Sequence, residues 1–591
     1  MTRPAFLGVE RSIAGRRWIA RLEDERAAQA IAATHGLVEP LARVLAARAV
    51  ALDDVPGFLS PSLRNNLPDP SSFKDMDEAA ERLALAIREG ELVAIFGDYD
   101  VDGATSAALL RRYVETVGGR CRVYVPDRLT EGYGPNAPAL RALAADGAKV
   151  VVTVDCGITA FEALAAGRGV GLDIVVCDHH AAEPRLPPAL VVNPNRLDES
   201  GAHRQLAAVG VAFLLAVALN RALRRAGHFG PQRAEPDLME LLDLVALGTV
   251  ADVVPLTGLN RVFVAQGLRV MARRGNAGLR ALADVARLAE APTTFHLGFL
   301  LGPRVNAGGR VGKSDLGARL LATDDPDEAA GLAVQLDRYN AERRTIEADV
   351  EAAALMAFDR APPGAVAVAM GKGWHPGVIG IVASRLKERF DRPALVIAVD
   401  DQGIGKGSGR SVRGIDLGAT VIAARQAGLL INGGGHPMAA GLTIEERNIP
   451  ALAAFLEERL APALASREAV PVLALDGAVA AKGATLELIE ALDRAGPFGS
   501  GHPEPRFALP SLRVVRADVV GEKHTRVILA GDDGGRIKGI AFRAEDGALG
   551  PALRRAGGRR LHVAGTLALN RFRGEVEPQI RIDDAAFLDE A

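Results

Sequence analysis

Between Met76 and Cys177 the sequence alternates short apolar runs with amphipathic segments, and this alternation constrains the fold more than any other feature. The apolar runs are 92–96, 122–125, 149–154 and 172–177, and helical patterns cover 78–89, 104–117, 137–145 and 158–166. Short apolar strands that alternate with helices are typical of a buried parallel sheet with helices on both faces. Helical patterns continue over 207–225 and 237–247. We therefore expect an α/β domain over residues 76–260.

Three of the expected strands end in groups that can bind a metal ion. These groups are Asp98, Asp100 and Asp102, then Asp155, then Asp178, His179 and His180. The carboxyl ends of parallel strands form the ligand-binding edge of such a sheet, so we expect these side chains to share one pocket. Close carboxylates repel one another unless cations neutralise them. Oxygen-rich ligands with one or two imidazoles suit Mn²⁺ or Mg²⁺, and a pair of such ions suits phosphoryl transfer. A calcium loop is excluded, because Leu109 stands where its twelfth-position glutamate would be.

Beyond residue 260 the sequence predicts two further domains and one long helix. The helix begins at Asp325 and Pro326, and a 4-3 apolar spacing continues to Ala353. Such a helix fits a coiled-coil dimer or an interdomain strut, and the new α/β pattern of 365–399 favours the strut. The glycine-rich segments 403–414 and 433–441 fit turns, solvated loops or backbone donors to phosphate. From Pro471 onward, short β-like runs with glycine turns predict a small barrel such as an OB fold.

The composition excludes several classes of protein. The formal net charge of -3 means that any nucleic-acid surface must be a local concentration of Lys and Arg. No apolar run approaches the roughly 18 residues that span a bilayer, and the first twenty residues lack the apolar core of a signal peptide. Three cysteines are too few for a disulfide framework. We therefore expect a cytoplasmic protein without a membrane span.

Several motifs resemble those of the DHH phosphoesterases. The strand-end segment Asp98–Gly103, Asp155, the Asp178-His179-His180 triplet and Gly248–Asp252 resemble motifs I to IV of that superfamily. Gly433–Gly441 is similar to the substrate-binding DHHA1 motif, and Arg304–Arg310, Trp374–Gly380 and Pro497–Pro505 are similar to segments of RecJ nucleases. RecJ nucleases usually carry asparagine where His502 stands. The resemblance covers residues 40–591 and implies an α/β fold: a DHH parallel-sheet domain plus a DHHA1 α/β domain joined by a long helix, with a C-terminal OB-like β-barrel.

The resemblance also implies roles for individual residues. The metal ligands would be Asp98, Asp100, Asp102, Asp155, His179 and Asp252. They would hold two divalent cations, Mn²⁺ or Mg²⁺, with Asp155 between them. Asp98 is included because DHH pyrophosphatases carry histidine at the position of Phe96. Asp178 would orient His179 through its ring N–H, and His180 would contact the scissile phosphate and protonate the leaving oxygen.

Substrate phosphates would meet a second set of residues, because arginine forks and backbone N–H groups bind phosphate well. This set is Arg304, Asn306, Arg310, His375, Ser408, Arg410, Ser411, Gly434, Gly435 and His436.

We therefore expect five parts, which are an N-terminal helical segment (1–75), the DHH catalytic domain (76–260), a helical connector (261–360), the DHHA1 domain (361–465) and the OB-fold domain (466–591). The resemblance to RecJ implies a monomeric exonuclease that degrades single-stranded DNA from 5′ to 3′ into 5′-mononucleotides by a two-metal mechanism. It would act in DNA recombination and repair beside other repair or single-strand-binding proteins. A phosphodiesterase for short oligonucleotides or cyclic dinucleotides needs no barrel, and a non-catalytic scaffold would lack some of the ligands. Inorganic pyrophosphatase is disfavoured by the DHHA1-like motif and the length.

Overall fold

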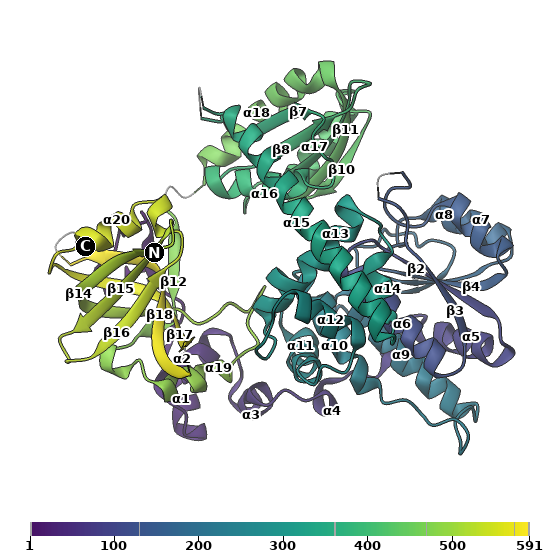
Figure 1. The fold of residues 1–591 in the computed structure, drawn as a ribbon, viewed down its shortest axis with the longest axis horizontal. Helices are drawn as coiled ribbons and strands as arrows, with labels where there is room; N and C mark the ends of the chain where they lie inside the picture. The colour runs from purple at the N-terminus through teal and green to yellow at the C-terminus, as the bar shows by residue number, and fades with distance from the viewer. Residues whose placement is uncertain (1–2, 129, 360–361, 468–469, 573, 589–591) are drawn as a thin grey trace. The chain divides into compact units, whose positions relative to one another are not determined.

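The computed structural model has a mixed α/β fold and describes residues 3–128, 130–359, 362–467, 470–572 and 574–588. The chain forms two compact units, and Figure 1 shows their elements along the chain. The two-sheet unit comprises Pro70–Asp252 and Val270–Glu468, and the barrel unit comprises Met1–Asp69, Val253–Arg269 and Ala469–Ala591.

The first sheet of the two-sheet unit is fully parallel, as the sequence predicts. Its strand order is β3-β2-β4-β5-β6. The strands are β2 (Leu92–Gly97), β3 (Arg120–Tyr124), β4 (Ala148–Val154), β5 (Asp173–Cys177) and β6 (Leu190–Val192). The helices α7 (Ala137–Ala145) and α8 (Phe161–Gly169) pack on one face, and α5 (Met76–Glu89), α6 (Val101–Thr116) and α9 (Ala208–Arg225) pack on the other. Strands buried on both faces explain the near-continuous apolar runs.

A helical region follows this sheet. Its helices are α10 (Leu242–Ala251), α11 (Gly258–Met271), α12 (Ala277–Val285), α13 (Gly302–Val311), α14 (Leu316–Ala322) and α15 (Pro326–Met356). The side chain of Asp325 caps α15 by accepting a hydrogen bond from the backbone N–H of Asp327 at 2.9 Å. The apolar face of α15 packs on α12, α13, α14 and then on α16 (Ile379–Phe390) of the same chain, so α15 is the predicted strut.

The second sheet has the order β10-β11-β9-β8-β7. Its strands are β7 (Ala367–Lys372), β8 (Ala394–Val399), β9 (Ile404–Arg410), β10 (Asn432–His436) and β11 (Ala439–Glu445). The helices α17 (Leu417–Gln426) and α18 (Ile449–Ala465) contribute to the core on one face, and α15 and α16 to the core on the other.

Most of the two glycine-rich segments forms strands, so the interpretation as turns or loops is wrong for residues 404–410, 433–436 and 439–441. Residues 411–414 and 437–438 lie outside the strands, and 413–414 and 437–438 form turns. In β9, Gly405, Gly407 and Gly409 alternate with larger polar side chains. A Cβ on Gly407 would lie 2.6 Å from a side-chain carbon of Leu442. These glycines therefore let the sheet core approach the backbone of β9, and no turn requires them.

The barrel unit contains the predicted closed barrel. Its strands are β14 (Phe507–Val520), β15 (His524–Gly531), β16 (Arg536–Ala541), β17 (Arg560–Phe572) and β18 (Glu575–Phe587). They pair in the order β14-β15-β16-β18-β17, and a pairing between β14 and β17 closes the barrel. The short helix α20 (Leu549–Arg555) lies between β16 and β17, as in an OB fold.

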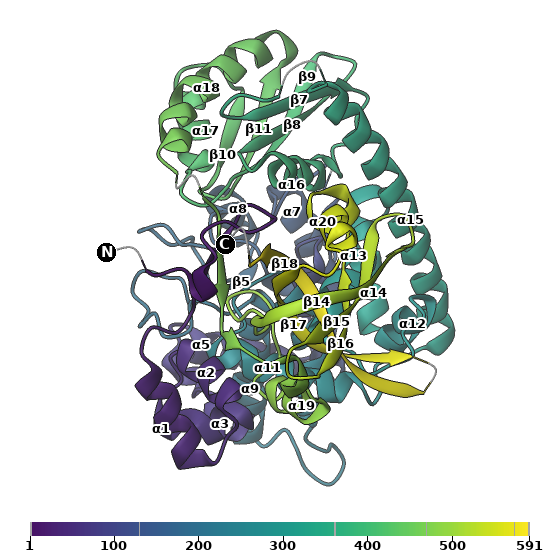
Figure 2. The same cartoon turned by 90° about the vertical axis from the view of Figure 1, so that its left-hand side faces the viewer.

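The N-terminal residues belong to the core of the barrel unit. They contain the helices α1 (Glu25–His35), α2 (Glu39–Ala47), α3 (Val55–Leu59) and α4 (Leu63–Asn66), and also the strand β1 (Arg17–Ala20), which pairs in parallel with β12 (Val472–Leu475). The indole of Trp18 is fully buried and donates a hydrogen bond of 3.1 Å to Asp584 of β18. The short strand β13 (Gly477–Ala478), the helix α19 (Leu486–Asp493) and most of α11 also belong to this unit. Its N-terminal part is purple and its barrel yellow in Figure 2. Within the described ranges, no helix is both long and apolar enough to cross a membrane.

Candidate metal centre

The carboxyl ends of three neighbouring strands bring the predicted acidic groups together. Asp98 follows β2, Asp155 follows β4 and Asp178 follows β5, and β4 lies between β2 and β5 in the sheet. Asp100 caps α6 by accepting the N–H of Gly103 at 3.1 Å. A Cβ on Gly103 would lie 2.5 Å from the carbonyl oxygen of Asp98, so glycine is needed for this tight entry into the helix.

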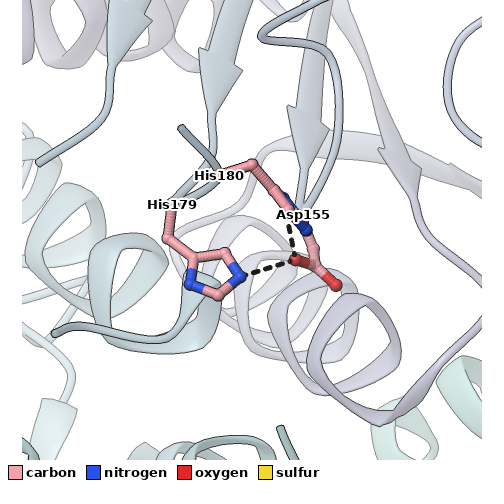
Figure 3. Close-up of side chains that lie close together, drawn as sticks. All are labelled: Asp155, His179 and His180. Carbon is pink, nitrogen blue, oxygen red and sulfur yellow. Dashed lines mark ion pairs between the residues drawn. The ribbon is translucent and has the colours of Figure 1, made fainter. Parts of the chain in front are cut away.

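Three overlapping groups of side chains place their ligand atoms within 4.8 Å of one another. They are Asp98 with Asp100 and Asp155, then Asp155 with His179 and His180, then Asp102 with His179 and Asp252. Figure 3 shows the middle group, in which both imidazoles face the carboxylate of Asp155. His179 Nε2 lies 3.3 Å from Asp155 Oδ1 and 3.6 Å from Asp252 Oδ2. Asp155 and His179 therefore connect the three groups into one cluster.

The chemistry of the cluster fits divalent cations. Asp98 Oδ1 and Asp155 Oδ1 are buried and have no hydrogen-bond partner among the described residues. Burial and the neighbouring carboxylates raise the pKa of Asp98 and Asp155 well above the usual value, that of Asp102 to about 7 and that of Asp252 to about 9. Buried carboxylates with unused lone pairs and strong mutual repulsion are the ligands that a cation would satisfy.

The orientation of His179 differs from the prediction. Its Nδ1 donates to the carbonyl oxygen of Leu206 at 3.0 Å, since a carbonyl can only accept. The free lone pair is therefore on Nε2, which faces the aspartates. The prediction that Asp178 orients His179 was wrong, because Asp178 bonds the ring of His180 instead.

Asp178 holds His180 in place. Its fully buried carboxylate accepts the backbone N–H groups of Ile158, His179 and His180, and His180 Nδ1 lies 2.8 Å from its Oδ1. Burial favours the neutral acid, but the hydrogen bonds and charge of His180 outweigh it and lower the pKa of Asp178. Burial likewise lowers the pKa of His180, but the bond to Asp178 and the other carboxylates raise it to about 9.

Tyr133 is part of this site, although the sequence did not suggest it. Its hydroxyl donates to the carbonyl oxygen of Asp155 at 2.9 Å and lies 3.4 Å from His180 Nδ1. Asp155 has a φ of 59°, a left-handed conformation that is uncommon for aspartate and frequent at functional sites. Tyr133 lies in the loop after β3, whose carboxyl end belongs to the same sheet edge, and this position is the signal that could have found it.

A cavity of about 420 Å³ lies beside β9, β10 and β11 in the same unit. Its lining contains four cationic side chains, those of Arg128, Arg310, Lys406 and Arg410. Among the described lining residues there is no acid. Ser408, Gly441 and Gly434 are adjacent in the strand register and form its floor. A Cβ on either glycine would meet nothing within 4 Å, so these glycines keep the floor open. The cavity is therefore suited to an anion.

This anion pocket adjoins the cluster of aspartates and histidines through Tyr99, which stands between Asp98 and Asp100. The guanidinium of Arg128 lies 4.9 Å from the ring centroid of Tyr99. A Cβ on Gly309 would lie 2.7 Å from the carbonyl oxygen of Tyr99, and the next residue, Arg310, lines the pocket. Arg128 and Arg310 therefore connect the pocket to the loop that carries Asp98 and Asp100.

Other predicted substrate-binding residues lie outside the anion pocket. Arg304 pairs with Asp337 at 2.9 Å and donates to the carbonyl of Leu300 at 2.7 Å. The buried hydroxyl of Ser411 donates to the carbonyl of Ile415 at 2.7 Å.

The other four predicted substrate-binding residues, which are Asn306, His375, Gly435 and His436, also do not line the anion pocket. Asn306 is half-buried on α13, and His375 accepts the N–H of Gly377 at 3.0 Å. Gly435 lies against Ala439 and Ala440, and His436 is exposed on β10. Arg128 was missed because it stands in a loop without a recognisable motif.

Metal removal should make the stability of the protein depend more strongly on pH. An aspartate titrates near pH 3.9 in an unfolded chain, but the pKa is about 7 for folded Asp102 and about 9 for folded Asp252. A carboxyl group whose pKa is higher in the folded than in the unfolded protein stabilises the folded state. This stabilisation is fully present below the pKa of the unfolded state, and it is lost as the pH rises through the pKa of the folded state. Bound cations favour the ionised carboxylates and offset this loss.

Scanning calorimetry at pH 6 and pH 8, with EDTA or excess Mg²⁺, measures this effect. We expect the EDTA sample to lose stability with rising pH. Saturation to about 100 times Kd adds about 2.7 kcal/mol, or roughly 3–4 °C in Tm for a unit of this size, and the gain should be larger at pH 8. The variant Asp252→Asn lacks one of these carboxylates, so the stability of its EDTA sample should depend less on pH. An equal gain at both pH values would contradict the assignment of these carboxylates to a cation site.

Comparison with known proteins places the chain in a family. Family models match residues 92–249 (DHH family, N-terminal domain), 363–461 (DHHA1 domain) and 475–584 (RecJ OB domain). The chain is 39% identical over 538 residues to the single-stranded-DNA-specific exonuclease RecJ of Dickeya dadantii, which covers 89% of this chain and 92% of that protein. It is similar to the crystal structure of RecJ from Thermus thermophilus in complex with Mn²⁺, with a TM-score of 0.79, 30% identity, and coverage of 96% of this chain and 78% of the other. The corresponding Mg²⁺ complex gives a TM-score of 0.74 and 29% identity with the same coverage. The cluster at the strand ends thus lies in a fold whose solved relatives bind Mn²⁺ or Mg²⁺, and the chain belongs to the RecJ exonuclease family.

Proposed function

We propose that this protein is a metal-dependent exonuclease that hydrolyses single-stranded DNA from its 5′ end to 5′-mononucleotides, in DNA recombination and repair. The observation that carries this proposal is the direct connection, through Tyr99, between a cluster of metal ligands and a cationic pocket. One substrate can therefore place a phosphodiester at the cluster and an anionic end in the pocket.

The proposed ligands of two divalent cations are Asp98, Asp100, Asp102, Asp155, His179 and Asp252. When bound, such cations activate water and polarise the scissile phosphate. Asp102 is held for this role by the backbone N–H groups of Ala208 and Val209 at 2.7 and 2.9 Å, at the N-terminus of α9. His180, hydrogen-bonded to Asp178 through Nδ1, presents Nε2 as a proton donor to the leaving 3′ oxygen.

The anion pocket would recognise the 5′-phosphate and so set the direction of cleavage. A terminal phosphate has more negative charge and more free acceptor oxygens than an internal one. Arg410 and Ser408 project from β9 into the pocket, while Lys406, Arg310 and Arg128 add positive charge around it. Burial and the charge of Arg128 lower the pKa of Arg410. The same causes lower the pKa of Arg310 to about 10, so Arg310 stays protonated near neutral pH.

End-labelled oligonucleotides test the whole proposal. Single-stranded and duplex DNA would be incubated with Mn²⁺, Mg²⁺ or EDTA, and the products sized on a gel. We expect mononucleotides from single strands only, released from the 5′ end and absent with EDTA. Cleavage in EDTA, internal cuts or degradation from the 3′ end would each contradict it.

The barrel would hold the single strand through exposed aromatic and basic side chains. Of the phenylalanines near arginines, Phe507 is fully buried, while Phe542 is 61% exposed and makes an edge contact with His524 at 5.3 Å. The side chain of Phe572 and the whole of Arg573 lie outside the described residues. Phe542 directly follows β16, the third strand of the barrel, and the second and third strands of OB folds contribute the face that binds single strands.

Phe542→Ala should therefore weaken the binding of a 30-mer roughly five- to a hundred-fold, the range that corresponds to the loss of one base–aromatic stack. The rate on a saturating tetranucleotide should stay within about two-fold. Fluorescence anisotropy measures the affinity, and Phe299→Ala, which removes an exposed ring from the two-sheet unit, is the matched control. Unchanged affinity in Phe542→Ala would remove this ring from the DNA path. Deleting the barrel is a poorer test, because its core includes Trp18 and other N-terminal residues.

The finer organisation follows the same proposal. We assign residues 76–260 to the DHH domain, 361–465 to the DHHA1 domain and 466–591 to the OB-fold domain, with 1–75 and 261–360 as the N-terminal segment and connector. The protein would act as a cytoplasmic monomer, beside other repair or single-strand-binding proteins.

A further inference from the structure

An Asn-Pro-Asn segment, Asn193 to Asn195, lies directly beneath the two histidines of the metal centre. It follows β6, which pairs with β5, so it lies beside the residues that follow β5. Asn193 Nδ2 donates to the carbonyl oxygen of His180 at 2.9 Å. Asn195 Nδ2 donates to the carbonyl oxygen of His179 at 2.5 Å and to that of Arg204 at 3.1 Å. Each asparagine therefore holds the backbone of one histidine.

The two asparagines are themselves fixed. Asn193 is fully buried, and its Oδ1 accepts the backbone N–H of Asn195 at 2.7 Å. Pro194 stands between them, and its ring restricts the backbone to one φ value. Both amide groups thus have a defined direction before any ligand binds, which is what a precise support requires.

The His179-His180 backbone needs such a support because it has left the sheet. β5 ends at Cys177, so the carbonyls of both histidines are beyond its ladder. Asp178 Oδ1 accepts their two N–H groups, and the asparagines bond their two carbonyls. A backbone carbonyl that loses its partner away from water is destabilised, so removing an amide donor leaves a carbonyl that moves to find another.

We propose that Asn193 and Asn195 are positioning residues that hold the imidazoles of His179 and His180 against Asp155. This amide clamp rests on the proposed function, since it acts on the residues assigned to metal binding and proton donation. Asn195 acts on His179, which faces the aspartates through Nε2. Asn193 acts on His180, which is not among the proposed ligands. The two asparagines therefore affect different properties of the enzyme.

Substitution of each asparagine separates these properties. Asn195→Ala in the full chain should weaken Mn²⁺ binding roughly ten- to a hundred-fold, the range found when a residue behind a metal ligand is removed. Asn193→Ala should lower kcat on single-stranded DNA at saturating Mn²⁺ by a similar factor, with less than about three-fold change in Mn²⁺ affinity. Neither substitution should change KM for DNA more than about two-fold. Mn²⁺ affinity is measured without DNA, by titration calorimetry and by the EPR signal of free Mn²⁺.

Asn220→Ala is the matched control for a buried amide with a purely structural role. Asn220 is buried in α9 of the same unit, where its side chain bonds the hydroxyl of Tyr113 at 3.0 Å and Glu235 at 2.6 Å. Its loss should lower Tm but leave Mn²⁺ affinity and kcat unchanged per folded molecule. Where an alanine variant fails to fold, Asn195→Asp or Asn193→Asp keeps the side-chain shape and replaces the N–H donor by a carboxylate oxygen.

Two results would overturn the clamp. Folded variants with wild-type Mn²⁺ affinity and kcat would show that the histidines keep their positions without it. Variants that lose only Tm, as Asn220→Ala does, would show a structural role alone. If the wild-type protein binds Mn²⁺ but does not cleave single-stranded DNA, the proposed function fails, and the affinities of the Asn195 variants still decide the clamp.

Discussion

Replacing Asp155 with asparagine should abolish cleavage, leaving less than about one hundredth of the wild-type kcat/KM at saturating Mn²⁺. Asp155 is the carboxylate shared by two of the three ligand groups, and its Oδ1 is buried without a hydrogen-bond partner among the described residues. Asparagine has nearly the same volume as aspartate, but it lacks the negative charge with which Asp155 would hold two cations. Single-turnover cleavage of a 5′-labelled oligonucleotide measures the loss.

The fold should survive this substitution, because it removes one of several repelling buried charges. Circular dichroism and Tm check this point. Asp173→Asn is the matched control: Asp173 lies at the opposite end of β5, and its exposed carboxylate pairs with Arg82. Surface ion pairs of this kind contribute about 0–1 kcal/mol to the free energy of unfolding. The control protein should therefore stay folded and cleave at the wild-type rate. A folded Asp155→Asn protein with a tenth or more of the wild-type rate would exclude the shared-ligand role.

Arg410→Ala should lower kcat/KM for 5′-phosphorylated single strands roughly ten- to a hundred-fold. This range corresponds to the 1.5–3 kcal/mol of a hydrogen bond to a charged group. The kcat/KM for strands with a 5′-hydroxyl should fall far less. The difference in kcat/KM between the 5′-phosphate and 5′-hydroxyl substrates should therefore become smaller. Ser408 Oγ lies 3.1 Å from Arg410 Nη1 and helps to fix the guanidinium in the pocket.

Matched 5′-phosphate and 5′-hydroxyl oligonucleotides decide this prediction. Arg413→Ala is the control, because Arg413 is an exposed arginine of the loop after β9 and does not line the pocket. If both substrates lose equally in Arg410→Ala, the guanidinium binds an internal phosphate or supports the sheet. The 5′-end sensor would then have to be sought elsewhere.

Local sequence patterns predicted an element well where burial in the structure itself produces the apolar pattern. Strands buried on both faces must be apolar throughout, so β2, β4 and β5 were recognisable and their acidic ends could be placed at one edge. β8 has the predicted bounds for the same reason. α16 has its predicted bounds because its buried residues, Ile379, Val382, Ala383 and Leu386, follow the spacing of a helix. The long helix was recognisable from its Asp325 cap and its apolar spacing.

The remaining features depend on contacts that local patterns do not contain. For the glycines at alternate positions of β9, the sequence analysis left turns, loops and phosphate donors open and did not predict a strand, although Lys406, Ser408 and Arg410 have the period of a strand. Nothing near Arg304 in the sequence shows that Asp337 on α15 would engage its side chain. The strand β1 was missed because its partner β12 lies roughly 450 residues later. The hydrogen bond between Asp178 and the ring of His180, instead of that of His179, depends on the backbone conformation of the turn after β5, which no local sequence pattern specifies.

The discontinuous barrel unit has a consequence for folding during synthesis. Translation at about 5–20 residues per second means that roughly 25–100 seconds separate the emergence of β1 from that of β12. For that time Trp18 and the apolar faces of α1 and α2 lack their partners on the nascent chain, while the whole two-sheet unit leaves the ribosome. The nuclease centre can therefore be complete before the barrel has closed. Until the last strand is released, the apolar side chains of the N-terminal residues cannot pack into the completed barrel core.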